Sequence, residues 1–206
     1  MTTTSTEQSK LNESLALAAT AGDVSELARL LALGADPMAD ASRPLFDASR
    51  KGHVECVRLL IPVSNTKALD SRALRGAALA GHAECVRLLA PVSNSSDDEF
   101  AALTSAASNG HAECVKLLLS DECSHQILAF CFGCSISGGH ASVAAVFLAH
   151  NPDLIELLNL AEATATALDR RHCELAALLT SISERDALLV AAAAMEPSTP
   201  TSAPRL

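Results

Sequence analysis

One stretch of this sequence occurs twice with only two letters changed. Residues 52–65 read GHVECVRLLIPVSN, and residues 81–94 read GHAECVRLLAPVSN. The Gly-His pair that opens both stretches recurs at Gly52, Gly81, Gly110 and Gly139, in steps of 29 residues. A fixed period of this size indicates a stack of similar units, in which each unit buries its apolar side against its neighbours.

The register extends in both directions. Gly22 precedes Gly52 by 30 residues, and Arg171 with His172 stands where the next Gly-His pair is expected, 32 residues after Gly139. We therefore expect repeats whose turn positions are Gly22, Gly52, Gly81, Gly110, Gly139 and Arg171.

Two helices can be predicted within each period. An alanine-rich segment such as LRGAALA precedes the glycine, and an amphipathic segment such as ECVRLL follows it. Apolar residues in the second segment recur at helical spacing. Pro62 and Pro91 stand just beyond it, where a missing N–H ends a helix. The pattern predicts tandem helix-turn-helix units.

These units resemble the ankyrin-repeat family, whose pattern is T-P-L-H-x-A-A-x-x-G-H-x-E-V-V-K-L-L-L-x-x-G-A-D. The matching stretches are RPLFDASRKGHVECVRLL, AALTSAASNGHAECVKLLL and LARLLALGAD. The period is shorter than the family's usual length of about 33 residues, and the loss falls where the family places a β-hairpin. Phe46, Arg75, Thr104 and Gly133 replace the family's first histidine. The resemblance implies an all-α ankyrin-type solenoid of about six repeats plus a C-terminal half-repeat cap, with shortened hairpin loops.

The two ends of the chain differ in composition from the repeats. Residues 1–10 and 196–206 are rich in Thr, Ser and Pro, and we expect both to be disordered tails. The repeat domain is then residues 11–195. Its last segment, RDALLVAAAAM, is the expected half-repeat cap.

Composition narrows the classes of partner and compartment. The net charge of −9 opposes attraction to nucleic acid, and no apolar run approaches the roughly 20 residues that span a membrane. The N-terminus lacks the features of a secretory signal. Seven cysteines spaced with the repeat predict a reducing, cytoplasmic environment. We expect a monomer that binds another protein, with no nucleic acid and no membrane.

Cysteine and histidine could carry chemistry or structure. Cys56, Cys85 and Cys114 share one register position, which predicts a buried column. A zinc site is a less favoured alternative for a second set, Cys123, His125, Cys131 and Cys134. The Gly-His histidines recur along the array and cannot share one site, so we expect them to bond backbone groups of the turn.

Catalytic motifs are not evident. Ser135 in GCSISGG suggests a nucleophile elbow, but Ser137 occupies the second glycine position and the context is helical. We therefore predict no enzyme activity, no catalytic residues, no metal and no cofactor.

Charged pairs follow the second helices. Glu55, Glu84 and Glu113 each precede an Arg or Lys by three residues, so we expect three exposed ion pairs on the convex side.

The positions that vary from repeat to repeat predict the binding face. In the resembled family, ligands contact the residues before the turn glycine and the loop tips, which implies a concave face formed by the first helices. In this chain those positions are Arg50, Lys51, Leu79, Ala80, Asp97, Asp98, Phe100, Ser108, Asn109, Ser137, Asp169 and Arg170.

Two narrower functions remain open at this point. The Ser/Thr-rich N-terminus would suit an effector exported by a bacterium or parasite to bind a host protein. The array could also be an inhibitor or immunity partner of an enzyme.

Overall fold

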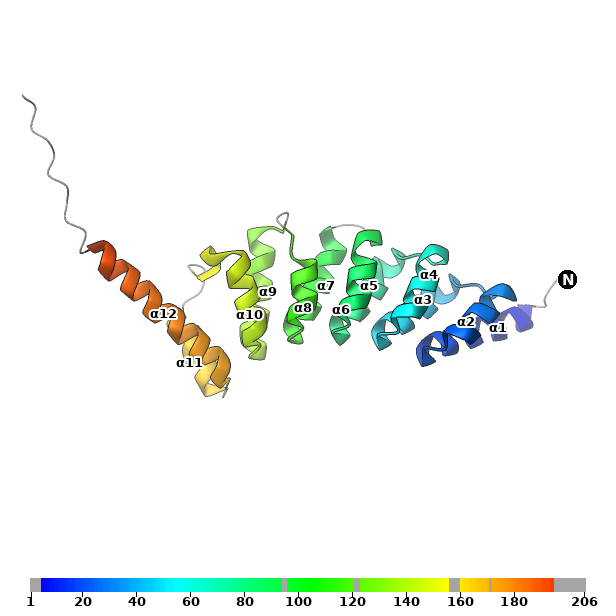
Figure 1. Cartoon of the computed structure of the whole chain (residues 1–206), viewed down its shortest axis with the longest axis horizontal. Helices are drawn as coiled ribbons and strands as arrows, with labels where there is room; N and C mark the ends of the chain where they lie inside the picture. Colours follow the sequence, from blue (N-terminus) through cyan, green and yellow to red (C-terminus); the bar gives the residue numbers. More distant parts are fainter. Residues whose placement is uncertain (1–4, 94–95, 121–122, 156–159, 171, 195–206) are drawn as a thin grey trace, which may run out of the picture.

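The helices of the protein run in pairs (Figure 1). The computed structural model describes residues 5–93, 96–120, 123–155, 160–170 and 172–194. Within these ranges there is no strand, which confirms the predicted all-α class. The six pairs, each a first helix followed by a second helix, are α1 (Ser5–Ala21) with α2 (Val24–Ala32), α3 (Ala39–Lys51) with α4 (Val54–Leu60), α5 (Ala68–Ala80) with α6 (Ala83–Leu89), α7 (Ser96–Ser108) with α8 (Ala112–Leu118), α9 (His125–Gly138) with α10 (Ala141–His150), and α11 (Leu160–Asp169) with α12 (Cys173–Ala194).

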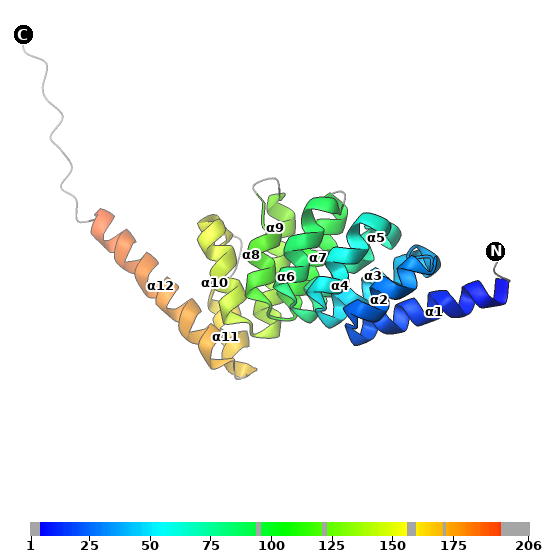
Figure 2. The same ribbon diagram turned by 45° about the vertical axis from the view of Figure 1, so that its right-hand side comes forward.

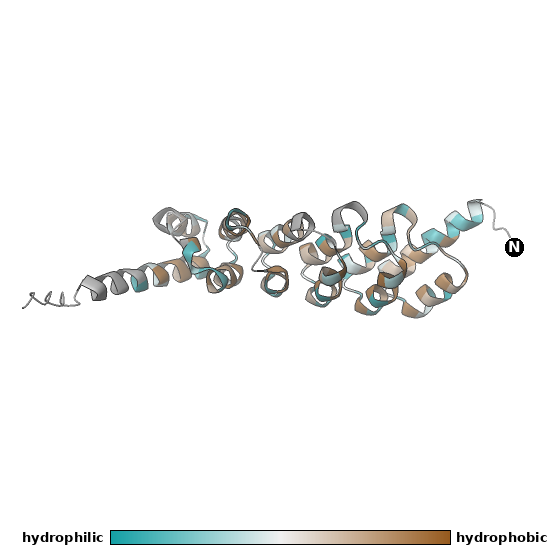
Figure 3. Ribbon diagram, turned by 90° about the horizontal axis from the view of Figure 1, so that it is seen from above, coloured by the Kyte–Doolittle hydropathy of each residue, from teal (hydrophilic) through white to brown (hydrophobic). Residues whose placement is uncertain are grey.

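The pairs stack side by side into an elongated array, with α1 at one end and α12 at the other (Figure 2). First helices contact first helices in the order α1, α3, α5, α7, α9, and second helices contact second helices from α2 to α10. From above, the helices of the middle repeats are seen end-on in two rows (Figure 3). Contact along the row of first helices is the more extensive.

Short 3₁₀ turns take the place of the family's hairpin loops. They span Ile61–Val63, Ala90–Val92 and Pro152–Ile155. Pro62 and Pro91 stand at the start of the first two turns, where a missing N–H costs no hydrogen bond. The expected shortening of the loops is therefore confirmed in these repeats.

A left-handed glycine ends the first helix of a repeat. Gly52 has a φ of 78° and Gly81 a φ of 80°, values that side chains with a β-carbon disfavour. The next amide closes the helix end, because His53 N donates to Ala48 O at 3.0 Å. The chain can then begin the second helix directly.

The histidine after each turn joins its repeat to the preceding one. His111 Nε2 lies 3.1 Å from Leu79 O, and since a carbonyl only accepts, Nε2–H is the donor. The same bond links His53 to Thr20 O and His140 to Ser108 O, both at 3.0 Å. The predicted bond to a backbone group is confirmed for these three histidines, but the acceptor belongs to the previous first helix instead of the histidine's own turn.

Each of these rings also occupies the space beside the preceding glycine. A β-carbon added to Gly81 would lie 2.5 Å from His111 Nδ1, and one added to Gly22 would lie 2.5 Å from His53 Nδ1. The turn position therefore requires glycine for two reasons, its left-handed φ angle and the close approach of the histidine ring from the next repeat.

The predicted cysteine column forms part of the core. Cys56, Cys85 and Cys114 are buried on successive second helices, α4, α6 and α8. Burial raises the pKa of the Cys85 and Cys114 thiols to about 11, because the thiolate would lose its hydration. These thiols remain protonated and unreactive at neutral pH.

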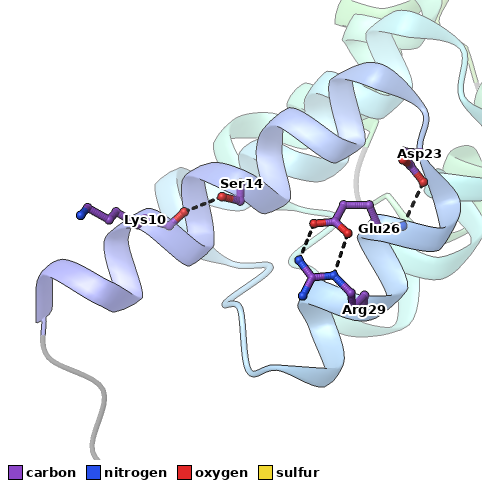
Figure 4. A network of polar contacts seen from close by, with 5 residues as sticks. All are labelled: Lys10, Ser14, Asp23, Glu26 and Arg29. Carbon is purple, nitrogen blue, oxygen red and sulfur yellow. Dashed lines mark hydrogen bonds and ion pairs between the residues drawn. The ribbon is translucent and has the colours of Figure 1, made fainter.

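The N-terminal end differs from the disordered tail expected for residues 1–10. Helix α1 begins at Ser5, and Gln8 Nε2 donates to Gly34 O and to Asn12 Oδ1, both at 3.0 Å. Because α1 already packs on α3, extending it by another turn toward the N-terminus does not require the unfavourable free energy of helix nucleation. In the same repeat, Asp23 caps α2 by accepting from Glu26 N at 2.9 Å (Figure 4).

The C-terminal end also differs from expectation. Residues expected to form a separate half-repeat cap continue α12, which runs to Ala194. No glycine or proline interrupts that segment, and its alanines and leucines favour an unbroken helix. Residues 196–206, expected to be a tail, lie outside the described part of the chain.

The buried column leads to a first prediction. Cys85→Asp should lower the free energy of unfolding by several kcal/mol, because it buries a charge without a partner. Cys85→Val should change it by less than about 1.5 kcal/mol. The measurement is urea denaturation, and Cys173→Asp on the exposed start of α12 is the matched control. Rapid labelling of Cys56, Cys85 and Cys114 by a thiol reagent in the native protein would contradict their burial.

The contact between repeats leads to a second prediction. His111→Ala should cost about 1–2 kcal/mol, because it leaves Leu79 O without its donor. Gly81→Ala should cost more, since it strains the turn and displaces the ring of His111. Gly133→Ala is the matched control, because an added β-carbon there meets nothing within 4 Å. The measurement is urea denaturation. Equal stability of Gly81→Ala and Gly133→Ala would contradict the role of Gly81 in the turn and in stacking.

Candidate functional site

The side chains before each turn glycine form a row on one side of the array. We call the surface of α3, α5, α7, α9 and α11 that carries this row the first-helix face. Each residue of the row belongs to the last turn of its helix or directly follows it. Ala80 is half-buried, and the other members are exposed: Arg50, Lys51, Leu79, Ser108, Asn109, Ser137, Asp169 and Arg170.

The remaining predicted residues lie at the other end of α7. Asp97 and Asp98 belong to its first turn, and their side chains lie outside what the structure describes. Phe100 is half-buried and packs against the core. Its ring centroid lies 6.0 Å from that of Phe130 on α9. Phe100 therefore stabilises the packing of α7 against α9, in addition to any contact that it makes with a partner.

Hydrogen bonds between repeats hold the backbone of the row in place. The carbonyls of Leu79 and Ser108 accept from the histidines of the following repeats. In the last repeat, Arg170 Nη1 donates to Ser137 O at 2.9 Å, and the ring of His172 lies beside Gly139. Arg170 was predicted as a binding residue, and in this structure it also joins two repeats.

Sequence reasoning missed an arginine on an aromatic ring. The Arg72 guanidinium lies 4.0 Å from the centroid of Phe46, and that of Arg50 lies 5.8 Å from the same centroid. Arg72 and Phe46 belong to adjacent first helices, α5 and α3. The register pairs Phe46 with Arg75 at the position of the family's first histidine, and it gives no signal for the contact with Arg72.

An apolar depression opens on α9, and sequence reasoning missed it too. It has a volume of about 570 Å³, and Phe130, Gly133, Cys134 and Gly138 are among its lining residues, together with Ser108 of α7. Phe130 is 56% exposed. Gly133 leaves the space open because it has no side chain. We call this depression the Phe130 pocket.

The opposite surface carries the predicted ion pairs. Arg58 lies 3.4 Å from Glu55, Lys116 lies 2.6 Å from Glu113, and Arg87 pairs with Glu84. The structure adds a fourth pair, Arg29 with Glu26, at 2.6 Å (Figure 4). We call this exposed side of α2, α4, α6 and α8 the second-helix face. Its charges neutralise one another locally.

The residues considered for chemistry do not form a metal or catalytic site. Cys131 is buried and contacts Thr104 Oγ1 at 3.4 Å, whereas His125 is exposed and its Nδ1 lies 3.3 Å from Asn151 Nδ2. Over the described ranges, no three His, Cys, Asp or Glu side chains are grouped to hold a metal ion. Ser135 is buried within α9, and its Oγ donates to Phe132 O at 2.7 Å. The geometry of a nucleophile elbow is therefore not present at Ser135.

None of the described helices is both long enough and apolar enough to span a bilayer.

Comparison with known proteins agrees with the architecture. The family pattern described as ankyrin repeats (3 copies) matches residues 15–91 and, in a second overlapping match, residues 63–129. No curated protein sequence matches the chain. Together the two matches cover residues 15–129, which is more than half of the 206-residue chain. The protein is a member of the ankyrin-repeat family.

Proposed function

We propose that the protein is a scaffold that holds another protein on the concave side of the array, along the first-helix face. Ankyrin repeats indicate a protein-interaction scaffold in general. The observation that carries the finer proposal is the contrast between constant and variable positions. The turn glycine and buried column repeat from unit to unit, whereas one register position holds a charged residue at Arg50, an apolar residue at Leu79 and a small polar residue at Ser108 and Ser137.

The arrangement of the helices supports the choice of this face. Contact along the row of first helices is more extensive than along the row of second helices. The first helices therefore form the more closely packed side of the array. Its exposed side chains stand on backbone that is bonded from repeat to repeat. A rigid surface loses little conformational entropy on binding, which favours affinity.

The alternative surface has weaker support. The second-helix face repeats nearly the same Glu–Arg or Glu–Lys pair in each of its helices. Exposed pairs of this kind contribute to solubility and give little basis for distinguishing partners.

A capture experiment tests which face binds. Tagged wild-type protein is used to enrich partners from an extract of the source organism, and captured proteins are quantified by mass spectrometry. Leu79→Ser, which removes an exposed apolar contact, should reduce capture of a specific partner at least tenfold. Arg87→Glu on the second-helix face should leave capture within about twofold. Loss of capture in Arg87→Glu with full capture in Leu79→Ser would show that the proposal names the wrong face.

Binding kinetics with the captured partner test the charge at one end of the face. Arg50→Glu should mainly slow association, because a positive side chain that attracts the partner becomes a negative one. Leu79→Ser should mainly speed dissociation. Surface plasmon resonance at two salt concentrations separates these effects, and association of Arg50→Glu should decrease less with added salt than that of the wild type. Identical association rates for Arg50→Glu and wild type would contradict a role for this charge.

A further inference from the structure

Three arginines lie on neighbouring first helices. Arg50 belongs to α3, and Arg72 and Arg75 belong to α5. Over the described part of the chain, none of the three is in an ion pair. We call them the arginine cluster. The chain as a whole carries a net charge of −9, so an unpaired positive cluster is an exception to its overall charge.

The ring of Phe46 contacts two members of this cluster. It lies beneath the guanidinium of Arg72 and near that of Arg50, at 4.0 Å and 5.8 Å from the ring centroid. Gly76 leaves room for the ring, since a β-carbon there would lie 2.9 Å from Phe46 Cε2. An arginine that rests on an aromatic face keeps its N–H donors at the guanidinium edge, where they can bind a carboxylate.

The Phe130 pocket offers a second, apolar contact on the same face. Phe130 is 56% exposed, and the ring of Phe100 supports it from the adjacent helix at 6.0 Å. The pocket volume of about 570 Å³ is sufficient for a large apolar side chain. The pocket involves α7 and α9, whereas the arginine cluster lies on α3 and α5.

We propose that the first-helix face binds an extended segment of the partner that carries Asp or Glu over the arginine cluster and a large apolar or aromatic side chain in the Phe130 pocket. This inference rests on the proposed function and specifies the chemistry of the partner. Carboxylates suit the cluster because a guanidinium can bind both carboxylate oxygens. The pocket suits an apolar anchor because burying such a side chain against Phe130 removes both from water.

The helix between the two contacts favours an extended segment. Helix α7 carries short side chains between the two contacts, since Thr104 and Ser105 are half-buried and Ser108 is exposed. A strip of short side chains accommodates a strand more readily than a helix, whose diameter is about 10–12 Å. Packed helices lie about 8–10 Å apart, so α5 and α9 are separated by roughly 20 Å. An extended chain covers that distance in about six residues.

A peptide selection tests the inference without knowledge of the natural partner. A phage-displayed library of random 16-residue peptides is selected on the full-length protein, and binding of the enriched peptides is measured by fluorescence anisotropy. Enriched sequences should contain Asp or Glu about six residues from Phe, Leu, Met or Trp. Arg72→Glu and Phe130→Ser should each weaken binding about tenfold or more.

Matched variants separate binding from folding. Phe130→Leu should retain most of the affinity that Phe130→Ser loses, and Arg87→Glu should stay within about twofold of the wild type. A peptide whose acidic residue is changed to Arg should bind Arg72→Glu better than it binds the wild type. Circular dichroism of each variant verifies that the array is folded.

The possible failures distinguish this inference from the proposed function. Enrichment of peptides without the acidic and apolar pair, or no enrichment at all, would contradict the inference. So would peptides that bind Arg72→Glu and Phe130→Ser as well as they bind the wild type. In each of these cases the proposed function still stands if capture of a natural partner depends on Leu79.

Discussion

The contact between a histidine and the glycine of the preceding repeat determines how neighbouring repeats fit together. The ring of His111 occupies the space that a side chain at position 81 would fill, and its Nε2 donates to the carbonyl of Leu79. A larger residue in place of Gly81 would therefore have two effects, because it would strain the turn and also push the neighbouring repeats apart. Turn geometry and stacking are therefore two consequences of one interaction, which explains why the Gly-His pair recurs at a constant interval.

This contact also orders the backbone of the first-helix face. The residues just before each glycine are exposed, but the carbonyls of Leu79, Ser108 and Ser137 are hydrogen-bonded to the next repeat. Their side chains are therefore presented from an ordered backbone. In the last repeat Arg170 donates to the carbonyl of Ser137, while the ring of His172 lies beside Gly139 as the other histidines lie beside their glycines.

The few aromatic residues divide between core and surface. Phe132 and Phe147 are buried with their ring centroids 6.3 Å apart, whereas Phe46, Phe100 and Phe130 are half-buried or exposed. The charges divide in a similar way. Four of the ion pairs occupy the second-helix face, one joins Arg43 to Asp47 on α3, and the arginine cluster lies on the first-helix face without such partners among the described residues. One side of the array is thereby electrostatically neutral, and the other has distinct charged and apolar regions.

The sequence by itself determined the features that repeat. The 29-residue period, the helix pairs and the buried cysteine column follow from local helical spacing, and the structure confirms them. Only the tertiary structure decided which residues of different repeats meet, such as Arg72 with Phe46 and Phe100 with Phe130. Local periodicity states which side of a helix is buried, but a contact between helices depends on their separation, their rotation and the direction of each side chain. At the ends of the array, packing on α3 supports α1 from Ser5 onward. Helix α12 continues to Ala194 because no glycine or proline interrupts its segment, which is rich in alanine and leucine.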